Sequence, residues 1–226
     1  MCGKFTQLAQ QEMAFFHLLS VIPGTASPEA AIPENAPVTI SMPMRLAKVM
    51  RLGEDGKREF ASMKWGFSKP ENAAFKADHM HARAETINTR PTFAEAFAER
   101  RGIALVQTFN EGEEQPNGKT KQWVIRAKDR KPIAIAVIWE EWQGPSGAEA
   151  TFVMATVPPN ELIGRITDRM PAVLREADWP RWLGEDDAKS VEVKALLRTF
   201  DDEGAWEMNE QASSKAAKKP PQMDLF

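Results

Sequence analysis

The chain has 226 residues and a formal net charge of −3 at pH 7, with 42% hydrophobic and 27% charged residues. This composition is ordinary for a globular protein with a sizeable core, and it excludes attraction of nucleic acid by the field of the whole molecule. No apolar run reaches the roughly eighteen residues of a membrane span. The polar start around Lys4 lacks the apolar core of a signal peptide. The single cysteine, Cys2, cannot form an internal disulfide, so a reducing cytoplasmic compartment is expected.

The first third of the chain predicts one helix, one loop and one hairpin. Apolar side chains at helical spacing predict an amphipathic helix over 8–21. The proline-rich stretch 23–37 indicates a surface loop. Two β-like segments, 38–52 and 58–67, flank the turn sequence Glu54-Asp55-Gly56 and predict a hairpin.

The rest of the chain mixes strands and helices irregularly. Pro91 begins a predicted helix that Gly102 ends. Further predicted strands are 103–109, 121–127, 132–142 and 151–157, and further predicted helices are 160–166 and 188–200. We expect an α+β fold with a mainly antiparallel, barrel-like β core and surrounding helices. Residues 1–200 would form the domain, and the polar residues 201–226 a flexible tail.

Cys2 would become the N-terminal residue if Met1 were removed. It would then carry a thiol and an α-amine on adjacent carbons, with reference pKa values of roughly 8.5 and 7.7–8.0. Both groups are nucleophiles, and together they can close a five-membered thiazolidine ring on an aldehyde. The position of Cys2 alone does not exclude the alternative that it is a surface cysteine without a chemical role.

Several motifs, in this order and spacing, resemble the SOS response-associated peptidase (SRAP) family, which processes abasic sites. The resemblance covers about the first 185 residues. Its motifs are Met1-Cys2-Gly3-Lys4-Phe5, Trp65-Gly66-Phe67, Ala82-Arg83-Ala84-Glu85-Thr86, Phe109-Asn110-Glu111 and Asp168-Arg169-Met170-Pro171. The resemblance implies binding of single-stranded DNA at an abasic site and a covalent thiazolidine crosslink, without a cofactor. It also implies autoproteolytic removal of leading residues.

The same resemblance implies roles for individual residues. Cys2 would be the nucleophile and Glu111 the acid/base group beside it. The residues expected to bind DNA are Trp65, Phe67, Arg83, Thr86, Thr156, Thr167 and Arg169.

The residues themselves leave structural alternatives open. Glu111 could be a solvated carboxylate in an acidic turn. Trp65 and Phe67 could cover a hydrophobic face instead of stacking on bases. Arg83 could pair with Glu85 or Asp168.

Two positions depart from the family pattern. His81 stands where the family has asparagine, and Thr167 where it has histidine. One hypothesis is that His81 supplies the missing imidazole and is catalytic. The alternative is a non-catalytic relative that only binds single-stranded DNA. His79, His81 and Glu85 could share a face as metal ligands, but no further clear ligand follows, so no metal is predicted.

The last five residues, Gln222-Met223-Asp224-Leu225-Phe226, resemble the peptide by which bacterial repair proteins bind the replication sliding clamp. Gln222, Leu225 and Phe226 would be the anchors, at the end of a polar spacer. The alternative is a tail that folds back or has no partner. We expect a cytoplasmic, nucleoid-associated monomer.

A competing enzyme class also begins Met-Cys-Gly. Class II glutamine amidotransferases use the same N-terminal cysteine, but they later carry a His-Asn-Gly motif that this sequence lacks. This alternative is therefore ranked below abasic-site chemistry.

Overall fold

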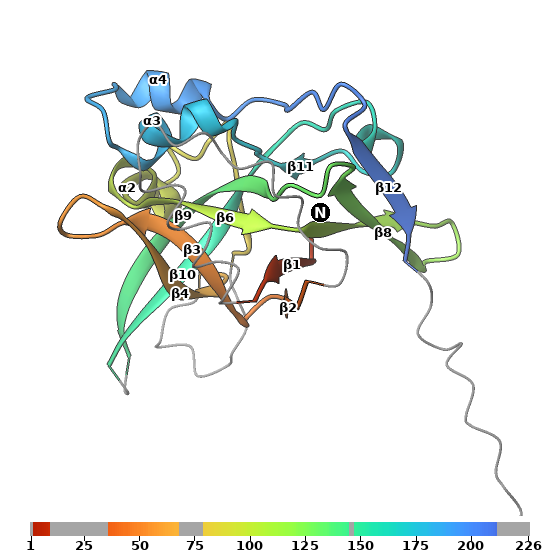
Figure 1. The fold of residues 1–226 in the computed structure, drawn as a ribbon, viewed down its shortest axis with the longest axis horizontal. Coiled ribbons are helices and arrows are strands. Elements are labelled where there is room, and N and C mark those ends of the chain that lie inside the picture. The colour runs from red at the N-terminus through yellow and green to blue at the C-terminus, as the bar shows by residue number, and fades with distance from the viewer. Residues whose placement is uncertain (1, 10–35, 68–78, 145–146, 212–226) are drawn as a thin grey trace, which may run out of the picture.

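The computed structural model describes residues 2–9, 36–67, 79–144 and 147–211. Most of the predicted helix at 8–21, nearly all of the predicted loop at 23–37 and the clamp-like pentapeptide lie outside the described residues. Two sheets dominate the described chain, with helices gathered at one side (Figure 1). No helix among the described residues is long and apolar enough to cross a membrane.

The first sheet has five strands in the order β12-β8-β7-β1-β2, and all of its pairings are antiparallel. The bounds are β1 Lys4–Leu8, β2 Val38–Ser41, β7 Thr108–Glu114, β8 Thr120–Ala127 and β12 Trp206–Glu210. Leu8, where the predicted helix begins, is therefore the last residue of β1, and the helix prediction is wrong there. Pairing on both edges of β1 outweighs the local helical spacing.

The second sheet closes on itself. Its closed ring runs β10-β4-β3-β6-β9 and returns to β10. The bounds are β3 Leu46–Leu52, β4 Arg58–Trp65, β6 Arg101–Val106, β9 Ile133–Gly144 and β10 Gly147–Val157. The short strands β5 (His81–Arg83) and β11 (Met170–Pro171) also pair with β10. This confirms the α+β fold with a mainly antiparallel, barrel-like core; of the strand pairs that the structure describes, only β10–β4 and β10–β5 are parallel.

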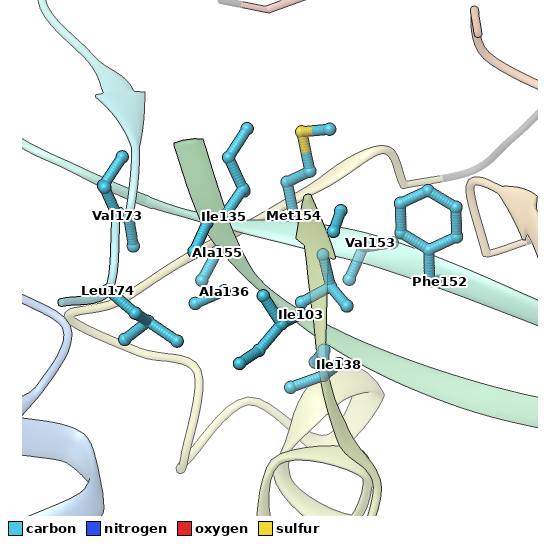
Figure 2. Packing of buried hydrophobic residues seen from close by; sticks show 14 of the residues in the cluster. Ile103, Ile135, Ala136, Ile138, Phe152, Val153, Met154, Ala155, Val173 and Leu174 are labelled. Carbon is cyan, nitrogen blue, oxygen red and sulfur yellow. The ribbon is translucent and has the colours of Figure 1, made fainter. Parts of the chain in front are cut away.

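Aliphatic side chains from the central strands form the core. Figure 2 shows Ile103 of β6 and Ile138 of β9 beside residues of β10, with Leu174 from the segment after β11. Among the described residues, the helices are α2 (Pro91–Glu99), α3 (Trp179–Leu183) and α4 (Ser190–Ala195), and the 3₁₀ turns are η1 (Ile163–Arg165) and η2 (Glu176–Asp178). Helix α2 packs against β9 and β6, and α3 packs against β6. Burial of this apolar surface is the main favourable contribution to folding.

Two predicted strands are each divided between the sheets. The segment 38–52 becomes β2 in the first sheet and β3 in the second, separated by a turn in which Met44 has a φ of 65°. The segment 103–109 is divided in the same way: its first residues belong to β6 in the second sheet, and its last residues belong to β7 in the first sheet. The apolar pattern indicated extended chain at both places but not the change of sheet.

Gly102 does not end a helix, contrary to the prediction. Helix α2 ends at Glu99, and Gly102 lies inside β6. A Cβ atom there would approach Val49 Cγ1 to 2.7 Å and the Met50 carbonyl oxygen to 3.0 Å. The glycine is required by close packing of β6 on β3.

The C-terminal part differs from the prediction in three places. The helix expected over 160–166 is the 3₁₀ turn η1, and the helix expected over 188–200 is confined to α4. The tail expected from residue 201 contains β12, which pairs with β8 over five positions. The sheet structure therefore extends to Glu210, ten residues beyond the expected boundary at 200.

Candidate active site

Cys2 lies directly before β1 and is buried, with 2% of its surface exposed. Its thiol donates a long hydrogen bond to the Lys4 carbonyl oxygen, with an Sγ to oxygen distance of 3.5 Å. The pairing of Lys4 with Asn110 and of Phe5 with Phe109 aligns β1 with β7. This register brings Cys2 to the part of β7 that holds Glu111.

Glu111 lies within β7 and is 1% exposed, so the alternative of a solvated carboxylate in a turn does not apply. Burial raises the pKa of its carboxyl group to about 7. A hydrogen bond from the Cys2 backbone amide opposes that rise in pKa, and the negative charge of Asp168 adds to it. The carboxylate thus contacts the nitrogen of Cys2 and titrates near neutral pH.

His81, on β5, completes the cluster. Its ring packs edge-on against Trp65, with 5.9 Å between ring centroids. Burial lowers the pKa of the imidazole to about 4, and a hydrogen bond with the Cys2 backbone partly opposes this shift. Its buried Nε2 atom has no hydrogen-bond partner among the described residues. The imidazole is therefore neutral at pH 7 and able to accept a proton or a hydrogen bond.

The thiol of Cys2 is held in its neutral form. Burial raises its pKa to about 12, and the nearby carboxylate of Glu111 contributes in the same direction. Thiolate chemistry at neutral pH therefore needs a base that removes the proton as the sulfur reacts. Cys2, Glu111 and His81, which come from three separate parts of the chain, are brought together by the fold.

Trp65 and Phe67, expected at the DNA surface, are core residues, with exposed fractions of 0% and 3%. The indole of Trp65 packs against Phe5 and Phe152, at centroid distances of 5.1 and 6.4 Å, and its N–H donates to the Met80 carbonyl at 3.2 Å. Neither ring presents a face on which an unpaired base could stack. Their contacts support the segments that carry Cys2 and His81 instead.

Arg83 and Thr86 are exposed, as a DNA contact requires. Arg83 is two residues from His81 on β5, so the two side chains point to the same face of that strand. Because Arg83 is exposed, its guanidinium is accessible to a phosphate group.

Arg169 and Thr156 are placed inside the protein. The guanidinium of Arg169 forms a bidentate pair with Glu85, at 2.6 and 2.9 Å, and donates to the Thr156 carbonyl oxygen at 2.6 Å. The Arg169 side chain is 10% exposed, and Thr156 is 2% exposed. These groups join β10 to the turn after β5, so Arg169, rather than Arg83, is the partner of Glu85.

Thr167 and Asp168 lie in the segment before β11. Thr167 is half-buried and Asp168 exposed. The sequence analysis named Asp168 only as a possible ion-pair partner of Arg83, whereas in the structure its charge raises the pKa of Glu111. Its place directly before Arg169 in a family motif was the available signal.

The metal alternative receives no support. Among the residues that the structure describes, no three His, Cys, Asp or Glu side chains could hold a metal ion together. The ring of His79 packs edge-on against Phe93, with a centroid distance of 5.3 Å.

The candidate site therefore centres on a buried cysteine next to the N-terminus, with a carboxylate at its backbone nitrogen. The model of the family "SOS response associated peptidase (SRAP)" matches residues 1–215, and the chain belongs to this family. This membership removes the support for a glutamine amidotransferase.

Curated relatives and solved structures agree with the family assignment. The chain is 26% identical over 211 residues to "Abasic site processing protein YoqW" of Bacillus subtilis strain 168, covering 89% of this chain and 88% of the relative. "Abasic site processing protein YobE" of the same organism is also 26% identical over 211 residues, covering 89% and 90%. A crystal structure of a protein from Bacteroides thetaiotaomicron has a TM-score of 0.72 at 19% identity, covering 92% of this chain and 91% of the other. That structural similarity supports the fold alone.

Proposed function

We propose that this protein captures abasic sites in single-stranded DNA by forming a covalent thiazolidine through Cys2 after removal of Met1. The names of its curated relatives support abasic-site processing. The observation that carries the chemistry is the contact between the buried Glu111 carboxylate and the backbone nitrogen of Cys2. Once Met1 is removed, that nitrogen is the α-amine.

The first step joins the amine to the aldehyde of the ring-opened abasic sugar. The Cys2 nitrogen attacks the C1′ carbonyl carbon, a C–N bond forms, and Glu111 carries one proton from the nitrogen to the carbonyl oxygen to give a carbinolamine. Glu111 then carries the second nitrogen proton to the hydroxyl, which leaves as water, so that a neutral imine remains. A carboxyl group with a pKa of about 7 can do both near neutral pH.

The second step closes the ring. The Cys2 sulfur adds to the imine carbon, its proton is removed, and the imine nitrogen gains a proton. The neutral imidazole of His81 can relay this proton, because its pKa of about 4 leaves the ring unprotonated. His81 thus provides the imidazole that Thr167 does not.

The exposed Arg83 and Thr86 would hold the DNA backbone beside the site. The removal of leading residues follows from the same groups. The Cys2 thiol would attack the Met1 carbonyl carbon, the peptide C–N bond would break as the nitrogen is protonated, and water would hydrolyse the resulting thioester.

The direct test uses protein whose mass shows that Met1 is absent. It is mixed with a single-stranded oligonucleotide carrying one abasic site and separated on a denaturing gel. A shifted band that is lost in Cys2→Ala and reduced in Glu111→Gln supports the proposal. Retention of DNA without a denaturation-resistant band would instead assign a binding protein without the chemistry.

The role of His81 has its own test. The rate of crosslinking in His81→Ala should fall about a hundredfold, the low end of what one general acid/base group contributes. A rate equal to that of the unsubstituted protein would remove His81 from the mechanism.

The C-terminal pentapeptide supports a second, separate proposal, namely that the protein binds a bacterial sliding clamp. A polar spacer before apolar anchors suits attachment of a tethered domain to a groove. A variant lacking residues 222–226 should lose retention on an immobilised clamp, and unchanged retention would contradict the proposal.

A further inference from the structure

Gln211 connects the end of the described chain to the strands of the active site. It follows β12, and its backbone N–H donates to the Gln122 carbonyl of β8 at 2.8 Å. Its side-chain Oε1 accepts hydrogen bonds from Asn110 Nδ2 at 2.9 Å and from Lys4 Nζ at 3.1 Å. One amide oxygen therefore joins β12, β7 and β1.

The two donors occupy a specific place in the sheet. Lys4 and Asn110 are paired with each other, and they are the pair of the β1–β7 ladder nearest to Cys2. Asn110 is 1% exposed and directly precedes Glu111, while Lys4 is two residues after Cys2. Because neighbouring residues on a strand point to opposite faces, Gln211 binds β7 on the face opposite to the Glu111 carboxylate.

We propose that Gln211 is a positioning residue for the covalent capture reaction, an inference that rests on the proposed function. It holds β1 against β7 at the last paired position and so fixes the distance between the Cys2 nitrogen and the Glu111 carboxylate. It does not touch the reacting atoms. Reactions that depend on proton transfer between prealigned groups lose rate steeply when the groups shift by an ångström or less.

The test compares Gln211→Ala with Gln211→Glu. The alanine variant loses both accepted hydrogen bonds, and its single-turnover rate of crosslinking should fall about tenfold while the dissociation constant for an abasic-site analogue stays the same. The glutamate variant retains an acceptor for Lys4 and Asn110 and should restore the rate to within about twofold. Both are measured well below the unfolding temperature of each variant, so that a loss of folded protein does not lower the rate.

Glu210→Gln is the matched control. Glu210 precedes Gln211 and forms an ion pair with Lys121 at 3.0 Å, away from the Lys4–Asn110 pair. Its crosslinking rate should equal that of the unsubstituted protein. An unchanged rate in Gln211→Ala, or no recovery in Gln211→Glu, would overturn the inference.

A second readout does not depend on DNA. Hydrogen exchange in a peptide covering residues 2–8 should be faster in Gln211→Ala than in Glu210→Gln, because the end of β1 nearest Cys2 opens more often. If the unsubstituted protein forms no crosslink, the proposed function fails, whereas faster exchange would still show that Gln211 holds β1 against β7. Equal exchange in the two variants would contradict that role whatever the crosslinking result.

Discussion

At the residue scale, the candidate site holds two titratable groups whose pKa values are shifted in opposite directions. Burial raises the pKa of Glu111 from 4.5 to about 7 and lowers that of His81 from 6.5 to about 4. Between these values both groups are uncharged in the folded protein, because desolvation disfavours the charged form of each. The sequence interpretation selected both residues from motifs, but neither shift follows from the sequence, since burial arises only from the fold.

These shifts predict opposing effects of pH on stability. Between pH 4.5 and 7, Glu111 is protonated in the folded state but ionised in the unfolded state. Its contribution to the free energy of unfolding therefore falls as pH rises. Between pH 6.5 and 4, His81 is protonated in the unfolded state but not in the folded state. Its contribution to the free energy of unfolding therefore falls as pH falls. The two contributions largely cancel in the unsubstituted protein.

Single substitutions should separate the two contributions. In Glu111→Gln the free energy of unfolding should fall by about 2–3 kcal/mol from pH 7 to pH 4, and in His81→Asn it should fall by a similar amount from pH 4.5 to pH 7.5. Urea denaturation at a series of pH values measures both. Profiles parallel to that of the unsubstituted protein in both variants would contradict these pKa directions.

Arg169 illustrates a residue whose motif was recognised but whose environment was not. Arg169→Met should lower the free energy of unfolding by about 2–3 kcal/mol, because it removes the donor of the Glu85 carboxylate and one of the two donors to the Thr156 carbonyl. Glu85 is half-exposed, so Glu85→Gln should cost only about 0.5–1 kcal/mol. Guanidinium denaturation measures both values, and equal losses would argue against a buried supporting role for Arg169.

At the element scale, the sequence located most strands but not their partners. The hairpin of β3 and β4 was predicted because its turn is local, with Gly56 at a φ of 73°. The divisions between β2 and β3 and between β6 and β7 were not predicted, since a change of sheet leaves the alternation of side chains intact. The strand β1 was not predicted, and the predicted helix overlaps it at Leu8, because the pairing partners of β1 are distant in the sequence.

Gly102 provides a test at this scale. Gly102→Ala would place a Cβ atom against Val49 and the Met50 carbonyl, so the free energy of unfolding should fall by about 2 kcal/mol, the usual cost of overpacking. Gly118→Ala is not a suitable control, because its φ of 73° adds strain of its own. Gly3, with no atom within 4 Å of a Cβ and no positive φ, would serve, and Gly3→Ala should change stability by less than about 0.5 kcal/mol.

At the scale of the whole molecule, the irregular order of predicted strands and helices predicted the α+β fold, although several individual elements were assigned wrongly. The family motifs did not show that Trp65 and Phe67 face inward, because a Trp-Gly-Phe sequence fits either side of a sheet. Composition also placed the start of the tail too early. Polar residues surround Trp206, yet that indole is buried against Phe109 and Phe200.

The extent of the domain can be measured by truncation. The reference is a protein of residues 1–211, which contains the whole of β12. A protein of residues 1–200 loses β12 and Trp206, and should be destabilised by at least about 4 kcal/mol, the scale of removing a buried tryptophan. Equal thermal unfolding of the two truncations would show that β12 adds little to the domain.

The most direct measurement of the central claim is the intact mass of the adduct between the Met1-processed protein and an abasic single-stranded oligonucleotide. Closure of a thiazolidine releases one water, so the adduct should weigh the sum of the two components less one water molecule. It should form without a reducing agent, survive denaturation and map to Cys2 after proteolysis. An adduct that requires borohydride trapping, maps to a lysine or never forms would contradict the account.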